Sequence, residues 1–242
     1  IYAARPGMGK TALILQIMMN ISLKHSCGVF SMEMSRQQLV KRMMVNLGRK
    51  SKFHIEKGEF GNSIKEIENR KIFIDDTCGL SIQELTARAH QMKRKNNIEI
   101  IFVDYLQLME GTTENRVEDV SAMSRGLKMI ARKLEIPVIA LCQLSRKCEI
   151  RNDKRPILSD LRNSGAIEQD ADIILMIYRD EVYNEDSDMK GIAEIIFRKH
   201  KNGALGTVNL AFYGKYTKFA NLAKDELPAQ QEPPPVKPRK WK

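Results

Sequence analysis

The glycine-rich turn at residues 4–11 is the feature that most constrains the fold. It reads Ala4-Arg5-Pro6-Gly7-Met8-Gly9-Lys10-Thr11. Residues 1–3 before it are typical of the end of a strand, and residues 11–24 after it carry apolar side chains at helical spacing. The turn matches the phosphate-binding pattern G-x-x-x-x-G-K-[ST] at every position except the first. We therefore predict a phosphate site between a strand and a helix; the alternative is a chance glycine turn before a helix.

The chemistry of such a turn explains its spacing. Small residues let successive backbone N–H groups surround a phosphate at a helix N-terminus, where the helix dipole also favours negative charge. Lys10 is placed to reach the β- and γ-phosphates of a nucleotide, and the Thr11 hydroxyl to coordinate Mg²⁺. Ala4 stands where the pattern has glycine, and a methyl group is tolerated there if φ is negative.

Strand and helix patterns alternate along most of the chain. Strands are predicted at residues 29–31, 71–75, 98–104, 137–142 and 173–178, and helices at 37–47, 81–95 and 117–134. Ser35 and Gln38 form a possible capping box at the start of the first of these helices. This alternation predicts an α/β fold with a mostly parallel sheet flanked by helices. Residues 193–201 and 207–212 are predicted to form a C-terminal β-hairpin.

Three polar residues stand at the ends of predicted strands. Asp104 ends an apolar run, Glu33 lies just past residues 29–31, and Gln143 directly follows residues 137–142. Strand ends of this kind meet at the crevice of a parallel sheet. Asp104 is placed to bind the water shell of Mg²⁺, Glu33 to accept a proton from an attacking water, and Gln143 to contact the γ-phosphate. The alternatives are a loop-capping Asp, a solvated Glu and a loop Gln without a role.

Charge and composition limit which kinds of partner and cellular location are expected for the chain. Forty Lys and Arg against thirty Asp and Glu give a formal charge of +10, which favours a polyanion such as nucleic acid, although charge alone is weak support. Apolar runs such as residues 173–178 are far shorter than the roughly 20 residues that span a bilayer. Four cysteines without a CxxC pair favour free thiols in a reducing cytoplasm. These features predict a cytoplasmic protein without a membrane segment.

The domain limits follow from the two ends. Because residues 1–3 begin in the middle of a strand, we expect the first domain, residues 1–222, to lack its natural start. Beyond it the composition shifts to Pro, Gln and Lys, so residues 223–242 are predicted to be a disordered tail.

Six segments together resemble the C-terminal, RecA-like ATPase domain of the DnaB family of hexameric replicative helicases. They occur in family order and cover nearly all of residues 1–220: ARPGMGKT, VFSMEMS, IIFVDYLQLM, PVIALCQLSR, LSDLRNSGAIEQDADIILMIYRDEVY and AEIIFRKHKNGALGTVNLAF. A phosphate-binding turn alone is generic, whereas DYLQLM and SGAIEQDAD are specific to this family. The resemblance implies a homo-hexameric ring around single-stranded DNA, with ATP bound between subunits.

The resemblance also assigns site residues. It implies that ATP contacts residues 4–11, that Thr11 and Asp104 serve Mg²⁺, that Glu33 is the catalytic base and that Gln143 senses the γ-phosphate. It further implies that Lys199 and Lys201 reach the γ-phosphate of the neighbouring subunit. Lys201 departs from the family, because an arginine usually stands there. Lysine keeps the charge but lacks the planar, bidentate guanidinium. The alternative is that both lysines merely solvate an exposed strand.

Two segments are implied to line the DNA channel of the ring. They contain Arg116, in the loop after residues 98–104, and Arg162, Asn163 and Gly165, in the loop 161–166. Asn163 stands where an acidic residue is common in the family. Aromatic residues make up only 6% of the chain and none interleaves with these loops. Base stacking, worth roughly 1–3 kcal/mol per base, is therefore not expected, and binding should run through phosphates.

The resemblance implies a replicative DNA helicase motor, driven by ATP, that unwinds duplex DNA and works with a helicase loader and a primase. Two alternatives remain from the residues. One is another RecA-like nucleic-acid motor, a recombinase or primase–helicase. The other is a non-catalytic ring scaffold that binds ATP and a loader protein without unwinding. The set Lys10, Thr11, Glu33 and Asp104 argues against the scaffold, whereas the lysine at position 201 leaves it open.

Overall fold

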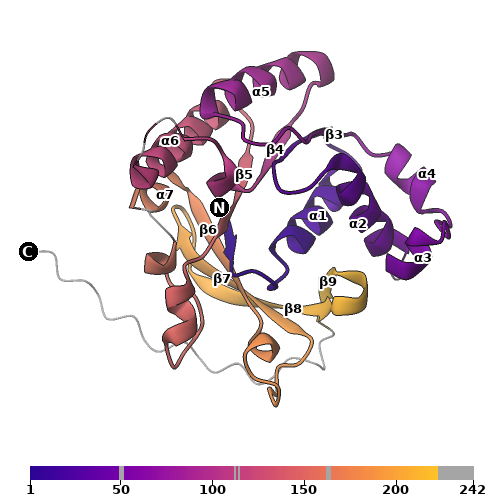
Figure 1. The fold of residues 1–242 in the computed structure, drawn as a ribbon, viewed down its shortest axis with the longest axis vertical. Coiled ribbons are helices and arrows are strands. Elements are labelled where there is room, and N and C mark those ends of the chain that lie inside the picture. The colour runs from indigo at the N-terminus through magenta and orange to yellow at the C-terminus, as the bar shows by residue number, and fades with distance from the viewer. Residues whose placement is uncertain (49–51, 112, 114, 162–164, 223–242) are drawn as a thin grey trace, which may run out of the picture.

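The computed structural model of the chain describes residues 1–48, 52–111, 113, 115–161 and 165–222. The described strands form one twisted sheet in the order β3-β2-β4-β5-β1-β6-β7-β8-β9 (Figure 1). The first six strands in this order are parallel to their neighbours, and the last three are antiparallel. The strands are β1 Tyr2–Ala4, β2 Cys27–Ser31, β3 Ile72–Asp75, β4 Ile100–Asp104, β5 Val138–Gln143, β6 Ile173–Tyr178, β7 Ile192–His200, β8 Gly206–Tyr213 and β9 Lys218–Asn221.

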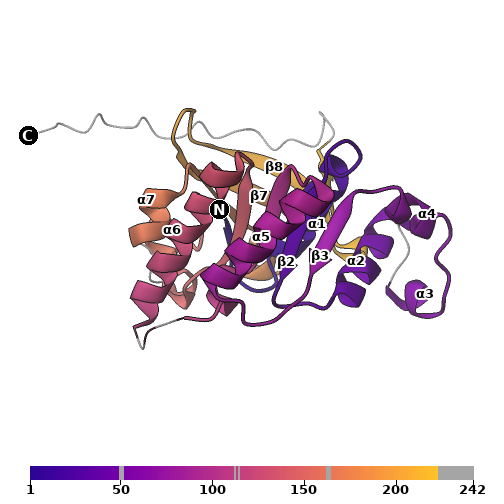
Figure 2. The same ribbon diagram turned by 90° about the horizontal axis from the view of Figure 1, so that it is seen from above.

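The helices cover both faces of the parallel part of the sheet, with α5 and α6 on one side and α1 and α2 on the other (Figures 1 and 2). The described helices are α1 Lys10–Ile21, α2 Arg36–Gly48, α3 Lys52–Glu56, α4 Ser63–Glu68, α5 Ile82–Asn96, α6 Arg116–Leu134 and α7 Gly165–Asp170. The α/β fold with a mostly parallel sheet, predicted from the sequence, is confirmed.

Strand β4 shows how the two-layered core arises. Ile101 and Val103 pack with the α5 and α6 side chains, while Ile100 and Phe102 pack with those of α1 and α2. Successive side chains of a strand point to opposite faces, so a strand covered by helices on both faces must be apolar throughout. The run ends at Asp104, the last residue of β4, at the end of the sheet where the parallel strands terminate.

Two helix starts are seen at atomic detail. Gln38 Oε1 accepts a hydrogen bond from Ser35 N at 3.0 Å, and Ser35 Oγ accepts one from Gln38 N at 3.4 Å, so the predicted capping box opens α2. A second box opens α5, where Ser81 and Glu84 satisfy each other's backbone N–H groups. Each pair occupies N–H donors that have no partner within the helix.

The predicted C-terminal β-hairpin is confirmed as β7 and β8; it continues the main sheet, because β7 pairs with β6 and β8 with β9. The structure differs from the sequence prediction at two places. Strand β9, and the short helices α3 and α4, were not predicted. Arg116 was expected in a loop but is the first residue of α6, and Gly165 likewise begins α7. Both are at helix starts, where a pattern of apolar spacing is weakest.

Among the described helices, none combines the length and apolar character needed to cross a membrane. The predicted disordered tail, residues 223–242, lies outside the described residues.

Candidate nucleotide-binding site

The turn at residues 4–11 joins the end of β1 to the start of α1. Gly7 and Gly9 have φ angles of 81° and 96°, in the region that favours glycine. Gly9 is the N-cap of α1. It has no side chain with which to occupy the N–H groups of the first helical turn, so these remain open to an anion. Ala4 belongs to the extended strand β1, so its methyl group causes no strain.

Aromatic side chains support this turn from the C-terminal strands. A Cβ on Gly9 would lie 3.0 Å from the ring of Phe219, which packs on Phe212 with 4.9 Å between centroids. Arg179 stacks over Phe212 at 3.9 Å and donates a hydrogen bond to Gly7 O at 3.1 Å. Strands β8 and β9 therefore hold the turn in shape, a role that the sequence prediction missed.

Lys10, Thr11 and Asp104 form the charged centre of the site. The Thr11 hydroxyl donates to Asp104 Oδ2 at 3.1 Å, and Lys10 Nζ lies 3.7 Å from Asp104 Oδ1. Burial lowers the pKa of Lys10, although Asp104 and Glu33 oppose the shift. Burial likewise raises the pKa of Asp104, against the effects of Lys10 and Thr11. Both groups are thus partly stripped of water, which strengthens their interaction with any ligand charge.

The donor set at Asp104 suits a magnesium ion. Its Oδ1 atom is buried and accepts no hydrogen bond from the described residues. A buried carboxylate oxygen without such a donor is normally costly. Carboxylate and hydroxyl oxygens are the ligands that Mg²⁺ takes, often through its bound waters. Asp104 and Thr11 therefore fit the ion that the sequence implied.

The sheet order brings the other strand-end residues to the same edge. Gln143 ends β5, which is paired with β1 on one side and β4 on the other, and Glu33 follows β2, the next strand along. Glu33, Gln143 and most of the turn line one cavity of about 830 Å³. This volume falls within the range of ligand pockets, roughly 300–1,000 Å³. The structure therefore places Glu33 and Gln143 beside Lys10 and Thr11, as the strand order required.

Gln107, just after β4, was not singled out from the sequence. Its amide accepts from Gln143 N at 3.1 Å and donates to Gln143 O at 3.1 Å, so it binds both backbone polar groups of the γ-phosphate candidate. The signal was available, since Gln107 lies within the DYLQLM segment. Arg42 on α2 was also missed; it lines the cavity and opposes the rise in the pKa of Asp104.

Arg5 has its side chain turned away from the expected phosphate position. Its Nη1 donates to Leu144 O at 2.8 Å, and its Nε pairs with Glu149 Oε1 at 2.9 Å. Only 10% of the Arg5 side chain is exposed. Arg5 can therefore serve a nucleotide through its backbone N–H alone, while its guanidinium ties the turn to the segment after β5.

Lys199 and Lys201 do not line the cavity described above. Lys199 lies on β7 and donates to the carbonyl oxygens of Glu168 and, at 3.1 Å, Gln169, at the end of α7. Lys201 lies one residue past β7, is exposed, and extends the strand pairing through a bond from its N–H to Asp172 O at 2.9 Å. Neither lysine therefore lies at the cavity of its own chain.

The DNA-binding candidates are only partly described. Arg162 and Asn163 lie outside the described residues. Gly165 is exposed at the start of α7, directly after that segment, and Arg116 begins α6. The structure thus gives the positions of Arg116 and Gly165 in the fold but no contact that tests a role in DNA binding.

Known proteins resemble this chain in sequence and in structure. The family model described as "DnaB-like helicase C terminal domain" matches residues 1–221. The chain is 45% identical over 246 residues to the replicative DNA helicase DnaB of Geobacillus stearothermophilus, covering 96% of this chain and 54% of that protein. It is 45% identical over 235 residues to the replicative DNA helicase DnaC of Bacillus subtilis (strain 168), covering 92% and 52%.

Solved structures extend the likeness to the backbone. One of them, described as an ATPase domain, superposes with a TM-score of 0.87 at 43% identity, covering 92% of this chain and 84% of that one. A DnaB-like replicative helicase, solved in a study of its interactions with primase, gives a TM-score of 0.87 at 43% identity, covering 92% and 57%. The chain spans about half the length of the curated relatives it matches. By sequence and by structure, it belongs to the family of DnaB-like helicase C-terminal domains.

Proposed function

We propose that this chain is the ATP-hydrolysing motor domain of a replicative DNA helicase. The observation that carries the proposal is the meeting of Lys10, Thr11, Glu33 and Gln143 at one cavity, in a chain of the DnaB-like family. Asp104 contacts Thr11 and Lys10 directly beside it. A scaffold that merely binds ATP would need the phosphate turn, but it would not need a carboxylate beside the cavity to activate water. The relatives named above are replicative DNA helicases.

Each residue has a defined task in this proposal. The N–H groups of residues 4–11 and the Lys10 ammonium bind the β- and γ-phosphates of ATP, and their positive charge stabilises the charge that develops during phosphoryl transfer. Magnesium, held through Thr11 and Asp104, would neutralise charge on the same oxygens. Glu33, exposed at the cavity, orients the attacking water and accepts its proton.

Gln143 contacts the γ-phosphate through its side-chain amide. An amide can report the presence of the phosphate without adding charge to the site. Because Gln107 binds both the N–H and the C=O of Gln143, the Gln143 side chain starts from a defined position. Such preorganisation matters, since misplacement by about 1 Å can cost on the order of 10²-fold in rate.

The proposal includes a homo-hexameric ring that encloses single-stranded DNA. Lys199 and Lys201 then reach the γ-phosphate bound to the neighbouring protomer, which accounts for their position outside their own cavity. Lys201 supplies charge without the bidentate geometry of arginine. Arg116, Arg162, Asn163 and Gly165 serve the DNA through phosphate contacts, which the formal charge of +10 favours. Hydrolysis in successive subunits moves these segments along the ring axis and separates the strands.

A helicase loader and a primase are the further partners proposed, and the cytoplasm the location. A structural neighbour was solved in a study of its interactions with primase. The proposal also includes translocation in the 5′ to 3′ direction, which the resemblance to the family implies.

The experiment that tests the proposal measures ATP turnover with and without single-stranded DNA, and unwinding of a forked duplex. A helicase motor hydrolyses ATP faster with DNA and opens the fork. A recombinase-like motor would hydrolyse ATP without opening it, and a scaffold would bind ATP with no stimulated turnover. Either of the last two results would contradict the proposal.

A further inference from the structure

The described residues after Gln143, 144–161, are joined to one another by several hydrogen bonds. We call residues 144–161 the connector; it contains the short helices η2 Arg146–Ile150 and η3 Leu158–Asp160. Its two ends lie side by side, because Leu144 and Leu161 form an antiparallel bridge and Ser145 N donates to Asp160 O at 2.8 Å. The end that leads towards α7 is therefore a direct neighbour of the residue after Gln143.

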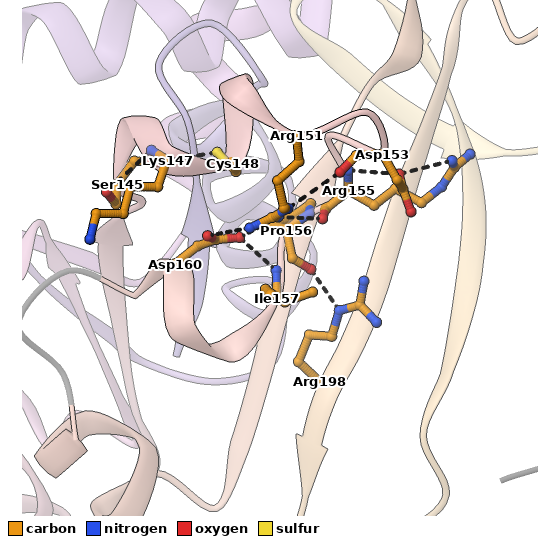
Figure 3. Close-up of polar contacts among 10 residues, drawn as sticks. All are labelled: Ser145, Lys147, Cys148, Arg151, Asp153, Arg155, Pro156, Ile157, Asp160 and Arg198. Carbon is orange, nitrogen blue, oxygen red and sulfur yellow. Dashed lines mark hydrogen bonds and ion pairs between the residues drawn. The ribbon is translucent and has the colours of Figure 1, made fainter.

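Arginine side chains fix the interior of the connector (Figure 3). Arg151 binds both carboxylate oxygens of Asp160, each at 2.7 Å, and the Asp160 carboxylate also accepts from Ile157 N at 2.8 Å. Arg198 on β7 donates to Pro156 O at 2.7 Å. Bidentate arginine–carboxylate pairs are strong and directional. Asp160 is only 2% exposed, so the connector has little freedom to bend internally.

A second bidentate pair ties the connector to the sheet. Arg155 binds the two carboxylate oxygens of Glu194 on β7 at 2.8 and 2.7 Å. The far side of the connector is thus held to β7, while a displacement at the Leu144 end passes to Leu161 through their direct bridge.

Arg5 is the residue of the phosphate turn whose side chain forms hydrogen bonds with the connector. Arg5 binds Leu144 O and Glu149 at once, while Leu144 N donates to Ala4 O at 3.1 Å. Tyr183 donates to the same Glu149 oxygen at 3.2 Å but comes from the segment after β6 and not from the turn. The Arg5 guanidinium, more than Tyr183, holds the pKa of Glu149 below its ordinary value. The carboxylate is thus charged and bound mainly to Arg5.

We propose that the Arg5–Glu149 pair couples the phosphate turn to the connector, so that nucleotide binding is transmitted to Leu161 and the start of α7. The inference rests on the proposed nucleotide site, and it gives Glu149 the role of a positioning residue that touches neither phosphate nor DNA. Because the turn must settle around the phosphates while Arg5 stays bonded, a shift of the turn pulls on Leu144 and Glu149 together. The rigid connector carries that shift to its other end.

Hydrogen exchange tests this coupling in the 242-residue chain, with and without Mg²⁺ and a non-hydrolysable ATP analogue. In the parent, the analogue should slow amide exchange in residues 4–11 and alter exchange in residues 157–161 and 165–170. In Glu149→Gln, slowing at residues 4–11 should persist while the response at 157–161 and 165–170 is lost. We expect a loss of about tenfold in that response, which corresponds to about 1.4 kcal/mol, the order of one charge-assisted hydrogen bond.

Tyr183→Phe is the matched control, because it removes a bond to the same oxygen without touching the turn, and it should respond like the parent. Glu149→Asp keeps the charge but falls short of Arg5, and it should behave like Glu149→Gln. A parent-like response in both Glu149 variants, or an equal loss in Tyr183→Phe, would overturn the coupling. So would a parent that protects residues 4–11 without any response in the connector. Absence of protection at residues 4–11 in the parent would overturn the proposed nucleotide site and the coupling with it.

Discussion

Replacing Gln107 with leucine tests whether a residue outside the phosphate contacts sets the rate of hydrolysis. Leucine removes both hydrogen bonds to the backbone of Gln143 while keeping similar bulk. Each bond contributes about 1 kcal/mol net, and a partly buried N–H and C=O left without partners add to the cost. We expect the free energy of unfolding to fall by about 2–3 kcal/mol.

The same change should lower kcat more than it alters KM. Gln143 would no longer be fixed in place, and a misplacement by about 1 Å can cost on the order of 10²-fold. We therefore expect kcat for ATP to fall by about 10- to 100-fold. KM for ATP should change by less than about threefold, because Lys10 and the turn at residues 4–11 remain intact.

Steady-state ATP hydrolysis and urea unfolding measure the two effects. Gln83→Leu on the exposed side of α5 is the control for the substitution itself, and its unfolding free energy should stay within about 0.5 kcal/mol of the parent. A Gln107→Leu variant that is destabilised as expected but keeps the parental kcat would refute a positioning role for Gln107.

Three further predictions concern the site and the connector. Gly9→Ala should lose about 1–3 kcal/mol of stability and most of its nucleotide affinity, because φ at Gly9 is 96° and the new Cβ would lie 3.0 Å from a phenyl ring. Fluorescence titrations measure the affinity. Gly206→Ala is the control: its Cβ would have open space around it, so it should bind nucleotide as the parent does. Lys201→Ala should lower the rate of DNA-stimulated ATP hydrolysis at least about tenfold and leave ATP affinity within about twofold, since an arginine finger contributes roughly 10³–10⁵ in rate. Lys201→Arg should raise turnover. Equal hydrolysis rates in the parent and both variants would show that Lys201 has no part in catalysis. Burial raises the pKa of Asp160, but hydrogen bonds from Arg151 and Ile157 outweigh it and lower the pKa below its ordinary 3.8. The stabilisation that the Asp160 carboxylate contributes is therefore present above about pH 4 and lost as pH falls through the lowered pKa. Between about pH 6 and about pH 3, the free energy of unfolding should fall less in Asp160→Asn than in the parent, and an equal fall in both would contradict that account.

The sheet and the strand-end residues could be predicted because local patterns determine them. A run such as residues 100–104, apolar on both faces and ending in a carboxylate, allows few placements in a helix-covered sheet. Once the strand order puts β1 beside β5 and β4 beside β2, the polar groups that follow these strands meet at one edge. The chain's own pattern thus placed Glu33, Asp104 and Gln143 at one edge, while the roles of Glu33 and Gln143 came from the resemblance to the family.

The contacts that depend on residues far apart in the sequence could not be predicted. Nothing in the pattern around Arg5 indicates that its side chain pairs with Glu149, 144 positions later, and not with phosphate. Strand β9 is only four residues long, and it exists because β8 supplies its pairing and Gly9 gives Phe219 a surface to pack on. Such elements are set by tertiary contacts, which override local preference.

The claim on which the account depends is that one protomer binds the ATP phosphates while a neighbour supplies the basic strand. Mixing Lys10→Ala with Lys201→Ala chains tests it, because the first lacks the phosphate-binding lysine and the second the proposed trans lysine. In a random ring, about a quarter of the interfaces would pair an intact Lys10 with an intact Lys201. The account predicts that ATP hydrolysis, low in either variant alone, recovers towards about that fraction of the parental rate on mixing. A mixture no more active than the average of the two variants would show that both lysines act within one chain, and would contradict the account.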